Sequence, residues 1–105
     1  MSDLDTVLHH PTRLTVLSFL SGCIEAEFSA VRDYCEVSDS MLSKTATALE
    51  AAGYIKVKKG YVGKRPRTWL AATRSGRDAL EAYLSGLQQL AADARAAGAA
   101  SADTD

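Results

Sequence analysis

The stretch from Ser38 to Gly53 has the features of one helix whose two ends are both marked. Ser38 is a favourable N-cap residue, Asp39 places a negative charge in the first turn, and Gly53 suits the left-handed residue that often follows the last turn. Between these ends, apolar residues recur at helical spacing and predict one narrow buried stripe, made of Leu42, Ala46 and Leu49. We therefore expect a helix that packs by one side only.

The opposite side of this helix carries short polar residues and one cation, namely Ser40, Ser43, Lys44 and Thr47. No bulky side chain on that face would keep the helix out of a DNA groove. A solvated helix face is also polar in most proteins, so this feature alone favours plain exposure to solvent. The neighbouring segments are needed to distinguish a DNA-binding face from one that is only exposed to solvent.

Charge is distributed very unevenly along the chain. Its 105 residues suit one domain with a modest core, and the formal net charge is only −1. However, residues 1–50 carry three bases and eight acids, residues 51–77 carry eight bases and no acid, and residues 78–105 carry one base and five acids. A block of cations without an acid is typical of a nucleic-acid-binding surface, although a solvated basic hairpin would have the same composition.

The basic block contains a predicted β-hairpin over residues 54–72. Residues 54–59 alternate apolar and polar side chains, residues 62–66 contain turn formers, and residues 67–72 make a second strand. Alternation places Ile55 and Val57 on one face, with Lys56 and Lys58 on the other. We interpret this hairpin as the wing of a winged helix.

The wing carries further cations near its tip and two aromatic residues. Lys64, Arg65 and Arg67 crowd the tip, where they suit DNA phosphates or the minor groove. Tyr61 and Trp69 are expected to be packing aromatics at the base of the hairpin, and stacking on single strands is the alternative. Trp69 alternates with Leu70, so it is expected to meet another helix or a partner subunit.

Two further helices are predicted on the N-terminal side of the helix at residues 38–53. His10 and Pro11 mark a helix start, the helix ends at Ser21 and Gly22, and its core positions are Leu14, Val16, Leu17 and Leu20. Residues 24–27 form a short linker that suits a small strand. Phe28 opens the next helix with Ser29 as its cap, and the expected core contacts are Val31, Tyr34 and Cys35. Residues 28–53 therefore form a helix-turn-helix.

The last predicted helix covers residues 74–97, capped by Thr73 or Ser75. Its apolar stripe is close to a heptad repeat, which is too much apolar surface for a peripheral helix. We predict a dimer interface formed by Leu4, Val7, Leu8, Leu80, Tyr83, Leu84, Leu87 and Leu90. In the alternative, the helix packs on its own domain. Residues 98–105 are rich in Ala, Gly, Ser and Asp and are expected to form a flexible tail.

Other functions find little support in the residues. Cys23 and Cys35 are expected to be small buried side chains, with a redox pair as the alternative, and the adjacent His9 and His10 lack further metal ligands. We expect no cofactor, and no catalytic set of nucleophile and base is present, so an enzyme is not expected. No apolar run is long enough for a membrane span and no secretory signal is found, which predicts a cytoplasmic protein.

Together these segments predict an α+β, mainly α fold, a winged helix-turn-helix over residues 1–97. The chain resembles the short winged-helix transcriptional regulators related to the MarR and ArsR groups. The matching motifs, in chain order, are H-P-T-R-L-x-V-L at residues 10–17, V-S-D-S-M-L-S-K at 37–44, L-E-A-A-G-Y-I at 49–55, G-K-R-P-R-T-W at 63–69 and T-R-S-G-R-D-A-L at 73–80. Each motif is loose, but five of them in order are specific.

The resemblance implies a homodimeric regulator that binds double-stranded DNA at a roughly palindromic site. The predicted DNA-binding set, drawn from the helix and the wing, is Ser38, Ser40, Ser43, Lys44, Thr47, Lys58, Lys64, Arg65 and Arg67. The resemblance also implies a small-molecule effector pocket between the DNA-binding unit and the dimer helices. This chain departs from many relatives in having Thr45 where they carry His or Arg, and Ala46 and Ala72 where they carry Leu. The smaller core residues predict a domain of modest stability.

An alternative from another functional class stays open at this point. A winged helix can serve as a protein-interaction module, in which the basic hairpin docks an acidic partner and reads no DNA.

Overall fold

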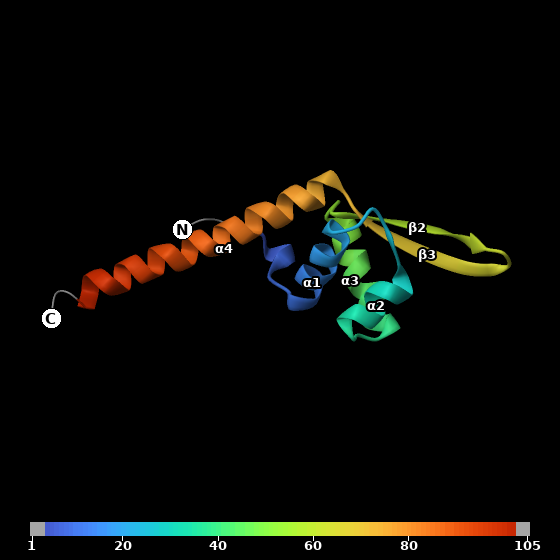
Figure 1. Ribbon diagram of the computed structural model, residues 1–105, viewed down its shortest axis with the longest axis horizontal. Coiled ribbons are helices and arrows are strands. Elements are labelled where there is room, and N and C mark those ends of the chain that lie inside the picture. The colour runs from blue at the N-terminus through green and yellow to red at the C-terminus, as the bar shows by residue number, and fades with distance from the viewer. Residues whose placement is uncertain (1–3, 103–105) are drawn as a thin grey trace.

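The computed structural model describes residues 4–102 (Figure 1). The elements follow one another in the order η1 (Thr6–Leu8), α1 (Pro11–Ser21), β1 (Ala26–Glu27), α2 (Phe28–Cys35), α3 (Asp39–Ala51), β2 (Ile55–Val62), β3 (Arg65–Ala72) and α4 (Arg74–Ala102). Helices α1 to α3 form the body, the β2–β3 hairpin projects from one end, and α4 projects from the other (Figure 1). The prediction of a mainly helical winged helix is confirmed.

Helix α1 begins and ends where the sequence predicted. Pro11 occupies the first helical position, after the extended residue His10, and Gly22 is the C-cap. The pyrrolidine ring fixes a helical backbone angle at a position whose N–H has no partner within the helix anyway. Val16, Leu17 and Leu20 are fully buried and Leu14 is partly buried.

Helix α2 differs from the prediction at its start and on one face. Its N-cap is Glu27 and not Ser29, because β1 continues directly into the helix and places Ser29 inside the first turn. Val31 is buried as expected, but Tyr34 is 65% exposed and was wrongly predicted to be a core contact. Its ring lies 5.1 Å from that of Phe19, between the centroids, at the surface of the body.

Helix α3 agrees with the sequence at both ends. The Ser38 hydroxyl accepts a hydrogen bond from the Met41 backbone N–H at 3.0 Å, and Gly53 has a φ of +81°. These two features satisfy a free donor at the first turn and allow the left-handed exit from the last. The apolar stripe faces inward, and its buried members are Leu42, Ala46 and Leu49, with Thr45 buried beside them.

The three strands form an antiparallel sheet in the order β1-β3-β2. The short strand β1 lies in the linker where a strand was expected, and it pairs with Trp69 and Leu70 of β3. The wing has the predicted extent, but its strands are longer and its turn is shorter than expected, since β2 and β3 stay paired up to Val62 and Arg65. Gly63, with a φ of +64°, makes the tight turn possible and leaves only residues 63–64 between the strands.

Helix α4 is longer than the sequence predicted. Thr73 is the residue that caps it, since the Thr73 hydroxyl accepts from the Gly76 N–H at 3.0 Å. The helix continues to Ala102, so the flexible tail predicted from residue 98 is wrong for 98–102, and residues 103–105 lie outside the described part of the chain. The reason is local, because alanine favours helix even where nothing is buried.

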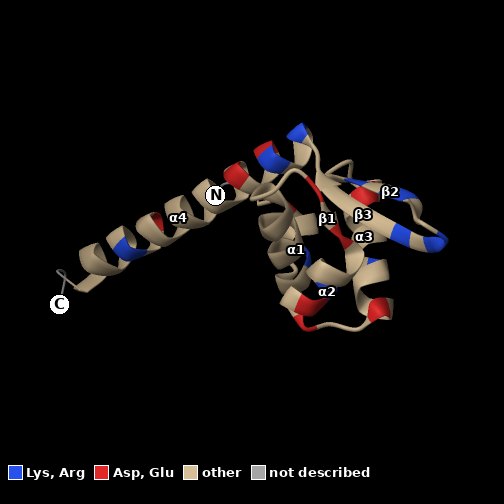
Figure 2. Cartoon of the chain, turned by 45° about the vertical axis from the view of Figure 1, so that its right-hand side comes forward, with Lys and Arg blue, Asp and Glu red and all other residues tan. Residues whose placement is uncertain are grey.

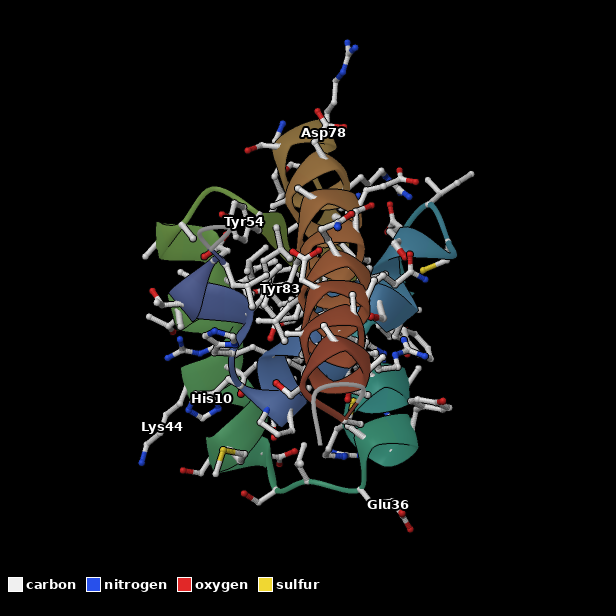
Figure 3. The ribbon with its side chains drawn as sticks, turned by 90° about the vertical axis from the view of Figure 1, so that its left-hand side faces the viewer. His10, Glu36, Lys44, Tyr54, Asp78 and Tyr83 are labelled. Carbon is white, nitrogen blue, oxygen red and sulfur yellow. The ribbon has the colours of Figure 1, made fainter. Side chains whose placement is uncertain are left out.

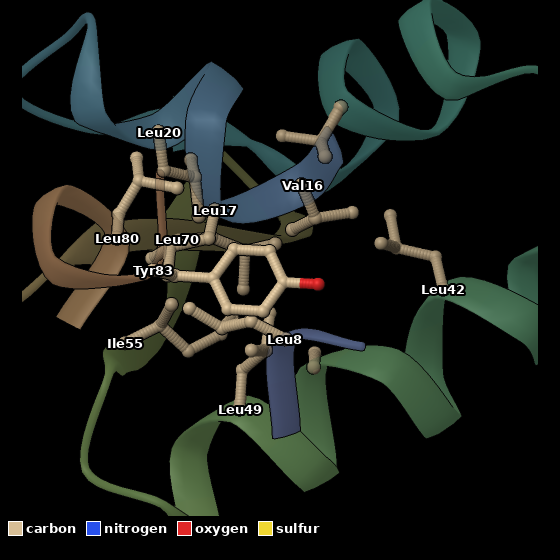
Figure 4. Close-up of a cluster of buried hydrophobic side chains, with 12 residues drawn as sticks. Leu8, Val16, Leu17, Leu20, Leu42, Leu49, Ile55, Leu70, Leu80 and Tyr83 are labelled. Carbon is tan, nitrogen blue, oxygen red and sulfur yellow. The ribbon is translucent and has the colours of Figure 1, made fainter. Parts of the chain in front are cut away.

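One cluster of apolar side chains forms the core (Figure 4). Its fully buried large members come from five elements and are Leu8, Val16, Leu17, Leu20, Val31, Leu42, Leu49 and Leu70. Tyr83 enters this cluster from α4, and its hydroxyl lies 2.7 Å from Nδ1 of His9. The first turns of α4 therefore belong to the body of the domain.

Three residues predicted at a dimer interface lie in this core instead. Leu8 is fully buried, Leu80 is 7% exposed and Tyr83 is 6% exposed within the single chain. The reason is that η1 lies against α1 and Tyr83, so these side chains are covered by their own domain. For this part of α4, the alternative of packing on its own domain is the correct one.

Tyr54 joins α3, the wing, α4 and the N-terminal segment. Its N–H donates to the Leu49 carbonyl at 2.9 Å, and its carbonyl accepts from the Thr73 N–H at 3.0 Å. Its hydroxyl donates to the carboxylate of Asp5. Gly76 lies so close that an added Cβ would be 2.1 Å from the Tyr54 carbonyl oxygen. The start of α4 is thus seated on the end of α3.

We expect Gly76→Ala to destabilise the domain, because the new methyl group would collide with the Tyr54 backbone. Overpacking of this kind costs about 1–3 kcal/mol. The matched control is Gly98→Ala, which has no neighbour within 4 Å and should stabilise the helix by about 0.5–1 kcal/mol. Urea unfolding measures both changes, and equal stability of the two variants would refute the close contact.

The Tyr54 hydroxyl gives the stability a defined dependence on pH. Its hydrogen bond to Asp5, together with desolvation and the charge of Asp5, raises the pKa of Tyr54 to about 12. The neutral phenol is therefore favoured in the folded state. This contribution is complete below pH of about 10, where tyrosine in the unfolded chain is neutral, and is lost as the pH rises toward 12.

We therefore expect the stability advantage of the wild type over Tyr54→Phe to shrink between pH 10 and 12. Denaturant unfolding of both proteins at pH 8 and pH 11 measures the difference. Stabilities that fall in parallel would show that the hydrogen bond to Asp5 is not formed in solution.

Candidate nucleic-acid interface

The outer face of α3 is polar and uncovered. Ser40, Ser43, Lys44 and Thr47 are all exposed, as the sequence predicted, and Lys44 extends away from the body (Figure 3). Met41 is also on the surface, 45% exposed, so the face is not entirely polar. This face has the slender shape that entry of a helix into a groove requires.

Two hydroxyl groups of the predicted set already have partners. Ser38 accepts the cap hydrogen bond from Met41, and Thr47 donates to the Ser43 carbonyl at 2.9 Å. The Thr47 proton is therefore used within the helix, and what this side chain offers outward is a methyl group and oxygen lone pairs. Ser40 and Ser43 carry exposed hydroxyls that can both donate and accept.

An arginine holds α3 to α2 at the turn. Arg32 donates to Asp39 in the first turn of α3 at 2.8 Å, and to Asp33 at 3.0 Å. Hydrogen bonds to Asp39 and Asp33 raise the pKa of Arg32 above its ordinary value. The pair is largely exposed, so its contribution to the free energy of unfolding is small, but it constrains the angle at which α3 is presented.

A cleft of about 650 Å³ separates α3 from the wing. Its lining residues come from both elements and from the start of α2, namely Phe28, Ser43, Ala46, Thr47, Glu50, Val57, Lys59, Thr68 and Leu70. The inner face of the wing, defined as the face that bears Val57, Lys59, Thr68 and Leu70, is thus turned toward the exposed side of α3. Lys59 brings a cation to this face.

Lys59 was absent from the predicted DNA-binding set. The signal was available in the sequence, because extending the alternation of Ile55 and Val57 by one step places Lys59 on their side of the hairpin. Lys59 is exposed and makes no ion pair among the described residues. It is the lysine of β2 that is best placed to accompany α3.

Two cations of the predicted set lie on the outer face of the wing, where they meet acids of residues 25–27, which we call the β1 segment. Lys58 lies 3.8 Å from Glu25, between Nζ and Oε1, and its ammonium lies 5.4 Å from the centroid of the Trp69 ring. Arg67 lies 3.4 Å from Glu27, between Nε and Oε1. Figure 2 shows basic residues along the hairpin and acidic ones on β1. These two cations are therefore partly neutralised within the chain.

The tip of the wing keeps its charge. Lys64 and Arg65 are exposed, and neither forms an ion pair with another described residue. Together with Lys59 they are the exposed cations on the tip and inner face that form no ion pair with a described residue, and we call these three the free wing cations. Lys56, on the outer face, is also exposed and forms no ion pair with a described residue. Their placement on a protruding hairpin suits contact with a phosphate backbone.

The two aromatic residues of the wing behave differently from each other. Trp69 packs on its own hairpin, with Lys58 over the ring and Gly60 so close that an added Cβ would be 3.1 Å from a ring carbon. Both of these neighbours belong to β2, so they give Trp69 a contact within the hairpin and not with a helix. Tyr61 was wrongly predicted at the base of the hairpin, since it lies near the tip and is 73% exposed.

A second surface runs along α4. Leu84 and Leu90 are 45% and 43% exposed, and Leu87 is partly buried. A cleft of about 500 Å³ lies beside them between α4 and the end of α1, with Arg77, Leu80 and Glu81 among its lining residues. Leu4 and Val7 are partly buried against the core. The role of these residues in a dimer stays a prediction.

The cysteines carry no bridge in the structure. Cys23 and Cys35 are both free thiols, and burial raises the pKa of Cys35, which disfavours the reactive thiolate. Among the helices in residues 4–102, none has the length and apolar character needed to cross a bilayer.

The chain belongs to the family described as winged helix DNA-binding domain, which matches residues 12–91. These residues include the helix-turn-helix, the whole wing and the first part of α4. The chain is also 26% identical over 84 residues to an uncharacterised protein of Methanocaldococcus jannaschii, a match that covers 80% of this chain and 91% of that one.

Solved structures of regulators share the fold. A transcriptional regulator homologue from Pyrococcus horikoshii OT3 is 27% identical, with a TM-score of 0.77, over 85% of this chain and 88% of that one. BpsR of Bordetella bronchiseptica, whose DNA binding is regulated by 6-hydroxynicotinic acid, has a TM-score of 0.64 at 16% identity, over 78% of this chain and 61% of that one. The chain therefore carries a winged helix DNA-binding domain by family, and its fold is similar to that of transcriptional regulators.

The two faces of the wing should differ in their contribution to DNA binding. We expect Lys59→Ala to weaken binding to every duplex and to reduce the slope of log affinity against log salt by about 0.9, the value for one lost phosphate contact. Lys58→Ala is the matched control and should change the slope less, because Glu25 already neutralises Lys58. Fluorescence anisotropy with a labelled duplex measures both slopes. A larger effect of Lys58→Ala would show that DNA contacts the outer face.

Proposed function

We propose that the protein is a sequence-specific regulator of transcription that binds double-stranded DNA as a homodimer. In this proposal α3 enters the major groove and the wing follows the phosphate backbone or the adjacent minor groove. The observation that carries the proposal is the shared orientation of two surfaces. The uncovered polar face of α3 and the inner face of the wing border the same cleft, and Lys59 lies on that side.

The chemistry of α3 supports direct reading of bases. The exposed hydroxyls of Ser40 and Ser43 can donate to or accept from base edges in the major groove. Thr47 presents its methyl group, because its proton is bonded to the Ser43 carbonyl, and a methyl group suits contact with the C5-methyl of thymine. Lys44 is long enough to reach a phosphate or a guanine.

Phosphate contacts are expected to supply most of the affinity. The recognition face carries few charged groups, whereas each protomer offers three free wing cations. A dimer would thus place at least six cations on the duplex. With a slope of about −0.9 per contact, six contacts imply a loss of affinity of about a thousandfold between 50 and 200 mM salt.

A dimer through α4 is supported by the shape of the molecule. Helix α4 runs beyond the body and leaves Leu84 and Leu90 exposed, which is apolar surface that a second copy can bury (Figure 1). Two copies joined there would present two α3 helices to successive major-groove segments, about 34 Å apart on one side of the duplex.

A small-molecule effector is the remaining part of the proposal. The cleft between α4 and α1, lined by Arg77 and Glu81 among others, lies where the DNA-binding unit meets the projecting helix. An effector bound there would bias the angle between them. The regulation of BpsR by 6-hydroxynicotinic acid is a precedent in a protein of the same fold.

The experiment that tests the proposal is a titration of the purified chain against a pool of random-sequence duplexes at 50 and 200 mM salt, with the mass determined by sedimentation. We expect salt-sensitive binding by a species of twice the chain mass. A flat salt profile, or no binding at low salt, would contradict the proposal and favour an acidic protein as the partner of the wing.

Two pairs of substitutions separate affinity from specificity in the same assay. Replacing Lys64 and Arg65 by Ala should weaken binding to all duplexes and lower the salt slope. Replacing Ser43 or Thr47 should change the preference among sequences selected from the pool, with little change in slope. Unchanged binding in both sets of variants would exclude this orientation on DNA.

A further inference from the structure

An exposed aromatic ring near the tip of the wing has no interaction partner among residues 4–102. Tyr61 is 73% exposed, and among the described residues it makes no hydrogen bond or ring contact. It lies opposite Pro66 in the paired strands, two positions before the turn at Gly63. A large ring in this place contributes nothing to the core, so its role has to be sought outside the chain.

Strand alternation places this ring on the inner face of the wing. Tyr61 follows Val57 and Lys59 at two-residue steps along β2, and both of those residues line the cleft beside α3. Val62, its neighbour, points to the other face and is 54% exposed. Tyr61 therefore lies on the side from which DNA would contact α3, and Val62 does not.

The hairpin presents Tyr61 in a fixed position. The pairing of β2 with β3 is complete from Ile55 to Val62, and the turn contains only two residues. The ring of Pro66 fixes the backbone angle of the residue across from Tyr61. The backbone beneath the ring is therefore ordered before binding, and only the side-chain torsions have to be fixed.

The charges around Tyr61 identify the kind of surface it meets. Among the free wing cations, Lys59 lies on the same face as Tyr61, Lys64 lies in the turn, and Arg65 lies beside the turn opposite Val62. A polyanion with apolar surface between its charges suits this set, and the walls of the DNA minor groove offer deoxyribose rings between phosphates. Tyrosine combines an apolar ring with a polar end, as such a wet boundary requires.

We infer that Tyr61 is the apolar contact of the wing with duplex DNA, its ring packed on deoxyribose between the phosphates bound by the free wing cations. This inference rests on the proposed function and deepens it. The wing then binds by two separable means, a salt-dependent ionic contact and a salt-independent apolar one. The apolar contact is made by Tyr61 alone.

The test compares Tyr61→Ala, Tyr61→Phe and Val62→Ala in salt titrations against the labelled duplex pool. Loss of a packed aromatic contact should lower affinity about fivefold at every salt concentration without changing the salt slope. Tyr61→Phe keeps the ring and should stay within about twofold of the wild type, a difference well below that of a lost ring. Val62→Ala, an exposed apolar change on the outer face, should leave affinity unchanged.

Several results would overturn the inference. Equal affinities of Tyr61→Ala and Val62→Ala would show that the ring does not contact DNA. A Tyr61→Phe variant as weak as Tyr61→Ala would assign the contact to the hydroxyl instead. If the wild type itself bound no duplex, the proposed function would fail as well, so the two failures are distinguishable. Urea unfolding midpoints equal to that of the wild type establish that the variants are folded.

Discussion

Burial of one leucine cluster is the interaction on which the rest of this structure depends. Leu8, Leu17, Leu49 and Leu70 come from η1, α1, α3 and β3, and each is almost completely withdrawn from water. An isolated two-stranded hairpin is marginally stable at best, so the wing needs this attachment. Ile55 and Leu70, near the base of the hairpin, anchor it in the core, and the distal part can then project without packing of its own. The position of the wing beside α3 follows from the same contacts.

The acids of the β1 segment give the wing two unequal faces. Glu25 and Glu27 meet Lys58 and Arg67, so part of the positive charge is satisfied within the chain. Exposed ion pairs of this kind add little to stability, but they change which cations remain available to a partner. Of the cations left free, Lys59, Lys64 and Arg65 lie at the tip or toward α3, and Lys56 lies on the outer face near the base. A count of basic residues along the sequence therefore overstates the positive charge available on the outer face. It also does not show that Lys59 lies on the face toward α3.

Tyr54 gives the projecting helix a rigid connection to the DNA-binding unit. Its backbone joins the end of α3 to the start of α4, and Gly76 seats α4 directly on it. The hydroxyl of Tyr54 ties the same point to Asp5 in the N-terminal segment. Strain from a change in the direction of α4 would be passed to α3 at such a joint, because close-packed interiors have low compressibility and transmit strain. If an effector binds beside α4, as proposed, this joint connects its site to α3.

The sequence by itself determined the features that depend on neighbouring residues. These are the caps of α3 at Ser38 and Gly53, the start of α1 at Pro11, and the alternation that makes the hairpin. The extension of α4 to Ala102 also depends on neighbouring residues, because alanine favours a helix even where it buries no surface. A composition that cannot form a core can therefore still form a helix. Only the tertiary structure decided which surfaces are free. Leu8 and Tyr83 are in the core because distant segments meet there. Lys58 and Lys59 differ because Glu25, just before β1, meets the outer face and α3 borders the inner one. Local propensity fixes an element and its faces, but what each face meets depends on contacts between residues far apart in the chain.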